Sequence, residues 1–146
     1  MQTFLPYPSA VRSAACLDRQ RLGKQRVEAL QILRTLQGSS SGWAHHQAVK
    51  MWRGCEHALA IYGWAVCDEW LRRGYRDSCR WEFVAAMRGM DPEQVVAPSW
   101  IGDEAFHRSH QSNLVRKLPG HYGQLFPGVP DDLPYVWPVS VAKQRT

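Results

Sequence analysis

Residues 17–36 carry apolar side chains at the spacing of an α-helix. These apolar positions fall on one stripe, and they are Leu22, Ala29, Leu33 and Leu36. Gly38 suits a left-handed C-cap, and the sequence SSSG at 39–42 is typical of a flexible loop. The pattern therefore predicts a first main helix over residues 17–36.

A second stripe of the same helix is charged. At about 100° per residue, Arg21, Lys24 and Glu28 line up on a face away from the apolar stripe. One interpretation is a solvated ladder of ion pairs, each worth roughly 0.2–0.5 kcal/mol. The other is a functional site in which one carboxylate lies between cations, beside a buried face.

A second helical region is predicted for residues 46–73. Its apolar and aromatic positions step by three or four residues, and they are Val49, Trp52, Cys55, Leu59, Tyr62, Val66 and Trp70. Gly54 would divide the region into a short helix and a long one, Gly63 would allow close backbone packing, and Gly74 would end it. The aromatic stripe indicates a surface that faces the core.

A third helix is expected to begin near Gly102 and to end at Leu118, before Pro119. Asp103 and Glu104 would lie favourably in its first turn. Because no stretch shows sustained period-two alternation, the three main helices predict an all-α fold.

The segment before the first main helix is rich in proline. Pro6 and Pro8 predict an extended arm, and its large apolar side chains predict that this arm packs against the domain. Ser9 could cap a short helical turn over residues 10–15.

The remaining segments carry weaker patterns. Residues 76–83 are expected to form an extended turn, and Pro92 begins one short helical turn. Residues 121–138, rich in proline and aromatic side chains, should be irregular and packed back onto the helices. We expect a single domain over residues 1–138 and a flexible tail over residues 139–146.

Composition and charge narrow the class of protein. The 146 residues, 45% hydrophobic with seven tryptophans, are enough for one compact domain. The formal net charge of +5 favours phosphate polyanions as partners.

The cysteines and the start of the sequence indicate the cellular compartment. Cys16, Cys55, Cys67 and Cys79 show no zinc-type spacing, and their number alone allows three disulfide pairings. The start shows no signal-peptide pattern, and no apolar run approaches 18 residues. We therefore expect a reduced, cytoplasmic, monomeric protein without a membrane partner or a cofactor.

Three stretches resemble one enzyme family in their order and spacing. They are RLGKQRVEAL (Arg21–Leu30), EWLRRGY (Glu69–Tyr75) with His46 upstream, and SNLVRKLPGHY (Ser112–Tyr122). They are similar to the three helices of the pyrimidine-dimer DNA glycosylases, the small phage-type endonuclease V enzymes that excise UV photoproducts. The resemblance covers most of residues 9–126 and is closest to a divergent bacterial branch.

The resemblance implies a fold and a chemistry. The family folds as a compact three-helix domain in which the N-terminal arm threads towards a catalytic glutamate, and Glu28 occupies that position. The family's terminal α-amine attacks C1′ of the damaged nucleotide, forms an imine with the opened sugar, and β-elimination then cuts the strand. Such chemistry suits neutral pH because an α-amine ordinarily has a pKa of about 7.7–8.0, against about 10.4 for lysine.

The chain departs from the family pattern near its N-terminus. Residue 2 is Gln2, not a small residue, so aminopeptidases should leave Met1 in place. Either the Met1 amine is the nucleophile, or this branch has lost or altered the lyase step. The arm is several residues longer than in the family, and Val27 stands where the family has an arginine, with Arg26 adjacent.

Candidate DNA contacts come from the first and third helices. Phosphate contacts are predicted for Arg21, Lys24, Arg26, Arg116 and Lys117. His46, His110, Asn113 and Tyr122 complete the predicted DNA-binding set, although packing is an alternative for Tyr122 and a surface or capping role for the histidines.

A zinc site built from the histidines is a further alternative. His107 and His110 are spaced i,i+3, and His46 or His121 could join them, although no spacing signature supports a metal.

These observations lead to one hypothesis and two rivals. The hypothesis is a DNA-repair glycosylase, with or without AP-lyase activity, that excises a damaged or modified base from double-stranded DNA through Met1 and Glu28. The rivals are a non-catalytic nucleic-acid-binding module on the same scaffold and a metal-dependent nuclease that uses the histidines.

Overall fold

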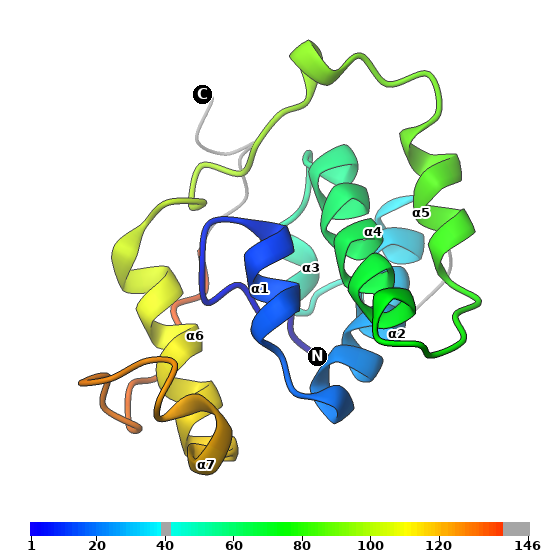
Figure 1. Cartoon of the computed structure of the whole chain (residues 1–146). Coiled ribbons are helices and arrows are strands. Elements are labelled where there is room, and N and C mark those ends of the chain that lie inside the picture. The colour runs from blue at the N-terminus through cyan, green and yellow to red at the C-terminus, as the bar shows by residue number, and fades with distance from the viewer. Residues whose placement is uncertain (39–41, 139–146) are drawn as a thin grey trace.

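The computed structural model describes residues 1–38 and 42–138, and all its regular elements are helical (Figure 1). In chain order they are α1 (Ala10–Cys16), α2 (Arg19–Leu36), α3 (Gln47–Lys50), α4 (Glu56–Arg72), α5 (Arg80–Met87), a 3₁₀ turn (Pro92–Gln94), α6 (Glu104–Lys117) and α7 (Pro119–Tyr122). Helix α4 packs against α1, α2 and α5, and α7 packs against α6. The all-α prediction is confirmed.

Side-chain caps fix where the predicted helices begin. The Ser9 hydroxyl accepts from the Arg12 N–H of α1, and the Asp18 carboxylate accepts from the Arg21 N–H of α2. Asp103 caps α6 in the same way. Each cap satisfies a backbone donor that has no partner inside its helix.

The second helical region is divided as its glycines predicted. Gly54 has a positive φ of 85° and lies between α3 and α4. Gly63 lies where a Cβ atom would come within 2.2 Å of the Phe83 ring, so its lack of a side chain lets α5 approach α4 closely.

The extended turn predicted for residues 76–83 is wrong, because α5 begins inside it. The Asp77 carboxylate accepts from the backbone N–H groups of Cys79 and Arg80, at 3.2 and 2.7 Å, and so starts the helix. The Phe83 ring, fully buried against Gly63, then holds α5 on α4.

The C-terminal part is irregular except for one short helix. Helix α7 (Pro119–Tyr122) forms directly after α6, so the prediction that residues 121–138 are irregular fails at His121 and Tyr122, although residues 123–138 contain no further helix or strand. Tyr135 and Trp137 pack against the core as expected. Residues 39–41 of the loop predicted at 39–42, and the tail predicted at 139–146, lie outside the described residues. None of the helices described is both long and apolar enough to span a membrane.

Candidate active site

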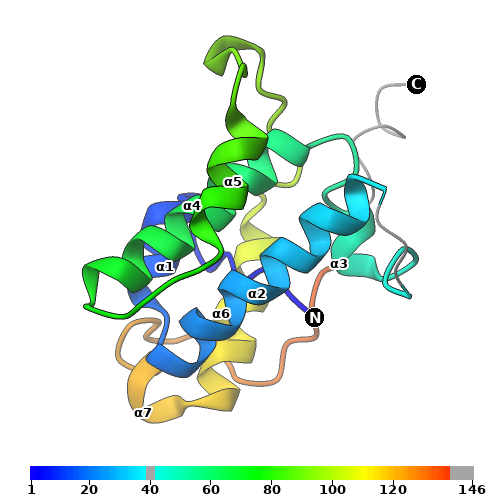
Figure 2. The same ribbon diagram turned by 90° about the vertical axis from the view of Figure 1, so that its right-hand side faces the viewer.

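The N-terminal arm is buried without belonging to a helix or a sheet. Residues 2–6 are buried, and Figure 2 shows this segment passing behind α2, with the N-terminus emerging beside that helix. Buried backbone N–H and C=O groups need partners, and here side chains supply many of them.

Two histidines of α6 hold the peptide groups of Leu5. The Leu5 N–H donates to Nδ1 of His110 at 3.0 Å. Nε2 of His107 accepts from the Gly102 N–H, so Nδ1 of His107 carries the proton and donates to the Leu5 carbonyl at 2.7 Å. Both rings must therefore be neutral, and burial lowers the pKa of His110 to about 3.

Gln25 of α2 joins the arm to the candidate glutamate. Its Nε2 donates to the Gln2 carbonyl at 2.8 Å and lies 3.2 Å from Oε2 of Glu28. Its Oε1 accepts from the Phe4 N–H at 2.9 Å and from the Tyr62 hydroxyl at 2.6 Å. Because Gln25 is only 1% exposed, this amide fixes both the arm and the carboxylate.

A pocket of about 300 Å³ opens at the end of the arm. Its lining includes Met1, Gln2, Phe4, Gln20, Arg21, Lys24, Gln25, Glu28, Lys117 and Tyr135. The half-buried Glu28 also accepts from the Gln2 backbone N–H at 3.2 Å. The residue that follows Met1 is thus tied to the candidate carboxylate.

Cations from α2 and α6 line the same pocket. Arg21 is ion-paired with Asp18 at 3.2 Å, whereas Lys24 and Lys117 form no ion pair with any residue described. Partial burial and the charges of Arg21, Arg116 and Lys24 lower the pKa of Lys117, against the opposing effect of Glu28. Such crowded, uncompensated cations favour an anionic ligand.

Charged groups of the pocket affect the pKa of His46. Burial and the charge of the Met1 amine lower the pKa of His46, while Glu28 opposes them. The ring caps α3 by accepting from the Ala48 N–H at 3.0 Å through Nδ1, which leaves Nε2 for other contacts.

A second hollow adjoins Glu28 on a neighbouring face of α2. It measures about 710 Å³, and its lining includes Gly23, Lys24, Val27, Glu28 and Trp70. Glu28 and Lys24 therefore belong to both hollows.

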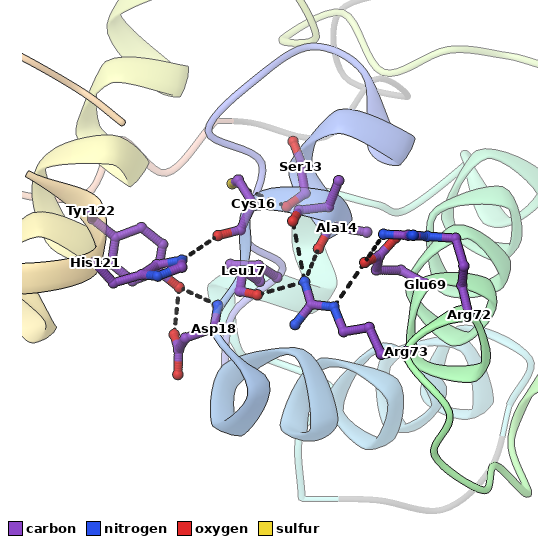
Figure 3. A network of polar contacts seen from close by, with 11 residues as sticks. Ser13, Ala14, Cys16, Leu17, Asp18, Glu69, Arg72, Arg73, His121 and Tyr122 are labelled. Carbon is purple, nitrogen blue, oxygen red and sulfur yellow. Dashed lines mark hydrogen bonds and ion pairs between the residues drawn. The ribbon is translucent and has the colours of Figure 1, made fainter. Parts of the chain in front are cut away.

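The start of α2 is held from the α4 side by an arginine (Figure 3). Arg73 donates through Nε to Glu69 at 2.7 Å and through an Nη atom to the Leu17 carbonyl at 2.8 Å. Burial opposes ionisation of Glu69, but hydrogen bonds from Arg72 and Arg73 outweigh it and lower its pKa. Arg73, held by Glu69, thus ties the corner between α1 and α2 to the end of α4.

Helix α7 holds the same corner from the other side (Figure 3). Nε2 of His121 donates to the Cys16 carbonyl at 2.8 Å. The Tyr122 hydroxyl accepts from the Asp18 N–H at 2.8 Å and donates to the Asp18 carboxylate. The register of α2, and with it the position of Glu28, is therefore set from two directions.

Four predicted DNA contacts, His110, Asn113, Tyr122 and Arg26, are engaged inside the protein instead, whereas Arg116 is exposed. His110, Asn113 and Tyr122 are at most 1% exposed, so direct contact with DNA is inconsistent with this arrangement. Arg26 pairs with Asp77 at 2.5 Å and so supports α5. The exposed Arg116 bonds to Asn113 and to the Asp131 carbonyl without an ion pair to any described residue, so a phosphate contact stays a prediction for it.

The histidine pair does not form the zinc site considered as an alternative. Nδ1 of His110 and both ring nitrogens of His107 form hydrogen bonds with backbone groups. Within residues 1–38 and 42–138, no group of three or more His, Cys, Asp or Glu is placed to hold a metal ion.

Two glutamines are the main residues that the sequence reasoning missed. Gln25 lies three residues before Glu28, so helical spacing places both on one side of α2. A polar residue one turn from a candidate carboxylate was the available signal for Gln25. Gln2 served only to predict that Met1 is retained, and nothing in the sequence indicated that Gln2 lines the pocket.

The N-terminal part of the chain matches a known protein family. A family model described as pyrimidine dimer DNA glycosylase matches residues 1–83, which contain the arm, Gln25 and Glu28. No curated protein matches the chain. No solved structure matches it either.

Proposed function

The chain belongs to the pyrimidine dimer DNA glycosylase family, and from that premise we propose that it excises a damaged pyrimidine base from double-stranded DNA through the Met1 amine and Glu28. The observation that carries the proposal is one pocket lined by Met1, Glu28, Arg21, Lys24 and Lys117. An amine, a carboxylate and cations in one hollow are the groups that imine-forming base excision on DNA requires.

The proposed reaction starts with the uncharged Met1 amine. Its nitrogen forms a bond to C1′ while the bond from C1′ to N1 of the base breaks and leaves its electron pair on the base. The attached amine then loses a proton, and the departing base takes one up. Opening of the sugar ring gives an imine, and loss of a C2′ proton expels the 3′ phosphate by β-elimination.

Glu28 is suited to two roles in this scheme. Its negative charge would stabilise the cationic sugar in the transition state, and its oxygens would carry protons between the amine and the sugar. The hydrogen bonds from Gln2 and Gln25 fix the position of the carboxylate relative to the start of the chain.

The cations would bind the phosphates on either side of the lesion. Lys24 lines both hollows, and Lys117 approaches the first hollow from α6. Neither forms an ion pair with a described residue, so each has charge available for a phosphate, and affinity should fall as salt rises.

Borohydride trapping tests the proposal. The purified protein is incubated with duplexes that carry a cyclobutane pyrimidine dimer or an abasic site, and the adduct is located by mass spectrometry. We expect a covalent adduct on Met1 in both cases. N-terminal acetylation should abolish it.

Glu28→Gln should reduce turnover at least 100-fold and leave DNA binding intact, because it keeps shape but removes the charge. Glu93→Gln, on the exposed 3₁₀ turn, is the matched control. Binding without any adduct would refute the catalytic proposal in favour of a non-catalytic nucleic-acid-binding module. DNA cleavage that EDTA abolishes, with no covalent adduct formed, would favour a metal-dependent nuclease.

A further inference from the structure

Gln2 lines the pocket, and one of the two polar atoms of its side chain has no hydrogen-bond partner among the described residues. The residue is 6% exposed, and its Oε1 accepts from the Thr3 N–H at 2.9 Å. Its Nε2 is buried and has no partner among the residues described. A buried amide donor without a partner costs about 1–3 kcal/mol, so such a group calls for a ligand.

The rest of Gln2 is held rigidly. Its backbone N–H donates to Glu28, and its carbonyl accepts from Gln25. With Oε1 also engaged, the orientation of the side-chain amide is fixed before any ligand enters. A donor positioned in advance is the kind of group that stabilises charge as it develops in a reaction.

The position of Gln2 in the chain limits which ligand atom it can meet. Gln2 directly follows Met1, whose amine would attack C1′, so in the proposed reaction its amide would lie near the reacting bond. In a pyrimidine nucleotide, O2 is the carbonyl oxygen attached to the carbon next to N1, on the base side of that bond. When the bond breaks, the electron pair left on N1 spreads onto O2.

We infer that the Gln2 side-chain amide donates a hydrogen bond to O2 of the departing pyrimidine base. This inference rests on the proposed function and adds a specificity-determining residue to it. The amide stabilises the anionic base while the bond between C1′ and N1 breaks. The proton balance is unchanged, because the amide keeps its protons and the base takes the one released by the attached amine.

The inference separates two steps that the pocket performs. Excision of a base requires stabilisation of the leaving group, whereas imine formation at an abasic site has no base to expel. A residue that only supports the arm would affect both steps alike. A residue that contacts O2 affects the first step alone.

The experiment compares Gln2→Met with the wild-type protein on two duplexes of the same sequence. One carries a cyclobutane thymine dimer, and the other an abasic site at the same position. Methionine has nearly the shape of glutamine without its donor, and its large side chain preserves Met1, which mass spectrometry verifies. Gln2→Glu is the second variant, because its carboxylate can still accept from Thr3 but cannot donate when ionised.

The expected result is a 10- to 100-fold loss of base excision with borohydride trapping on the abasic duplex unchanged within twofold. Gln94→Met, exposed on the 3₁₀ turn, should leave both activities unchanged. Equal losses in both assays for both variants, or no loss in either, would overturn the inference while leaving the proposed function in place. Absence of trapping by the wild-type protein would overturn the proposed function and this inference with it.

Discussion

Replacing Gln25 with leucine should loosen the arm from the rest of the fold. Leucine has a similar volume but makes none of the hydrogen bonds through which this amide joins Gln2, Phe4 and Tyr62. The Phe4 N–H and the Gln2 carbonyl would then be buried without their present partner. Tyr62 would keep an acceptor, because its hydroxyl also lies 2.8 Å from the Phe4 carbonyl.

The structure sets the size of the effect. Each buried backbone group left without a partner costs about 1–3 kcal/mol, so two such groups cost about 4 kcal/mol. The added apolar surface of leucine returns about 1 kcal/mol. The net loss of about 3 kcal/mol is a large fraction of the 5–15 kcal/mol typical of a domain, and it corresponds to a fall in Tm of roughly 6–12 °C.

Urea unfolding followed by tryptophan fluorescence measures this loss. Gln31→Leu, an exposed glutamine on the same helix, is the matched control and should change the free energy of unfolding by less than about 0.5 kcal/mol. A Gln25→Leu protein within about 1 kcal/mol of the wild type would refute the conclusion that this amide anchors the arm.

Three further predictions follow from the packing and charge of the fold. The pKa of His110 is about 3 in the folded protein and 6.5 in the unfolded chain, so between these pH values the unfolded chain binds a proton that the folded protein does not. The free energy of unfolding should therefore fall as the pH drops below 6.5, by about 2 kcal/mol at pH 5. Thermal melts of a His110→Leu variant should lack this pH dependence. Gly63→Ala should destabilise the fold by about 1–3 kcal/mol despite its better helix propensity, because the new Cβ meets the Phe83 ring; urea melts should show partial recovery on adding Phe83→Leu. Lys24→Ala should reduce the slope of log K against log salt for DNA binding by about one, whereas Arg26→Ala should lower Tm and leave that slope unchanged.

The helices and the charged stripe of α2 followed from local patterns. Apolar residues at helical spacing, the cap Ser9 and the acidic first turn at Asp103 are short-range signals, so the main helices could be placed within a few residues. Glu28, Arg21 and Lys24 lie on the predicted face. Their grouping around a pocket still depended on Met1, which the sequence places 27 positions from Glu28.

The path of the arm could not be read from the sequence, because its partners are distant in the chain. Phe4 bonds to a residue 21 positions away, and Leu5 to one 105 positions away. No local pattern reports such pairs. For the same reason the sequence predicted a DNA contact for His110. Helical spacing shows which residues share a face of a helix, but it does not show which face a distant segment will cover.

During synthesis, the N-terminal arm is made well before the α6 residues that bind it. Leu5 leaves the ribosome about a hundred residues before its partners His107 and His110. At about 5–20 residues per second, that interval is roughly 5–20 s, and contacts of such long range form late in folding. The arm is therefore uncovered on the nascent chain, and open to contact with other proteins, until α6 has been made.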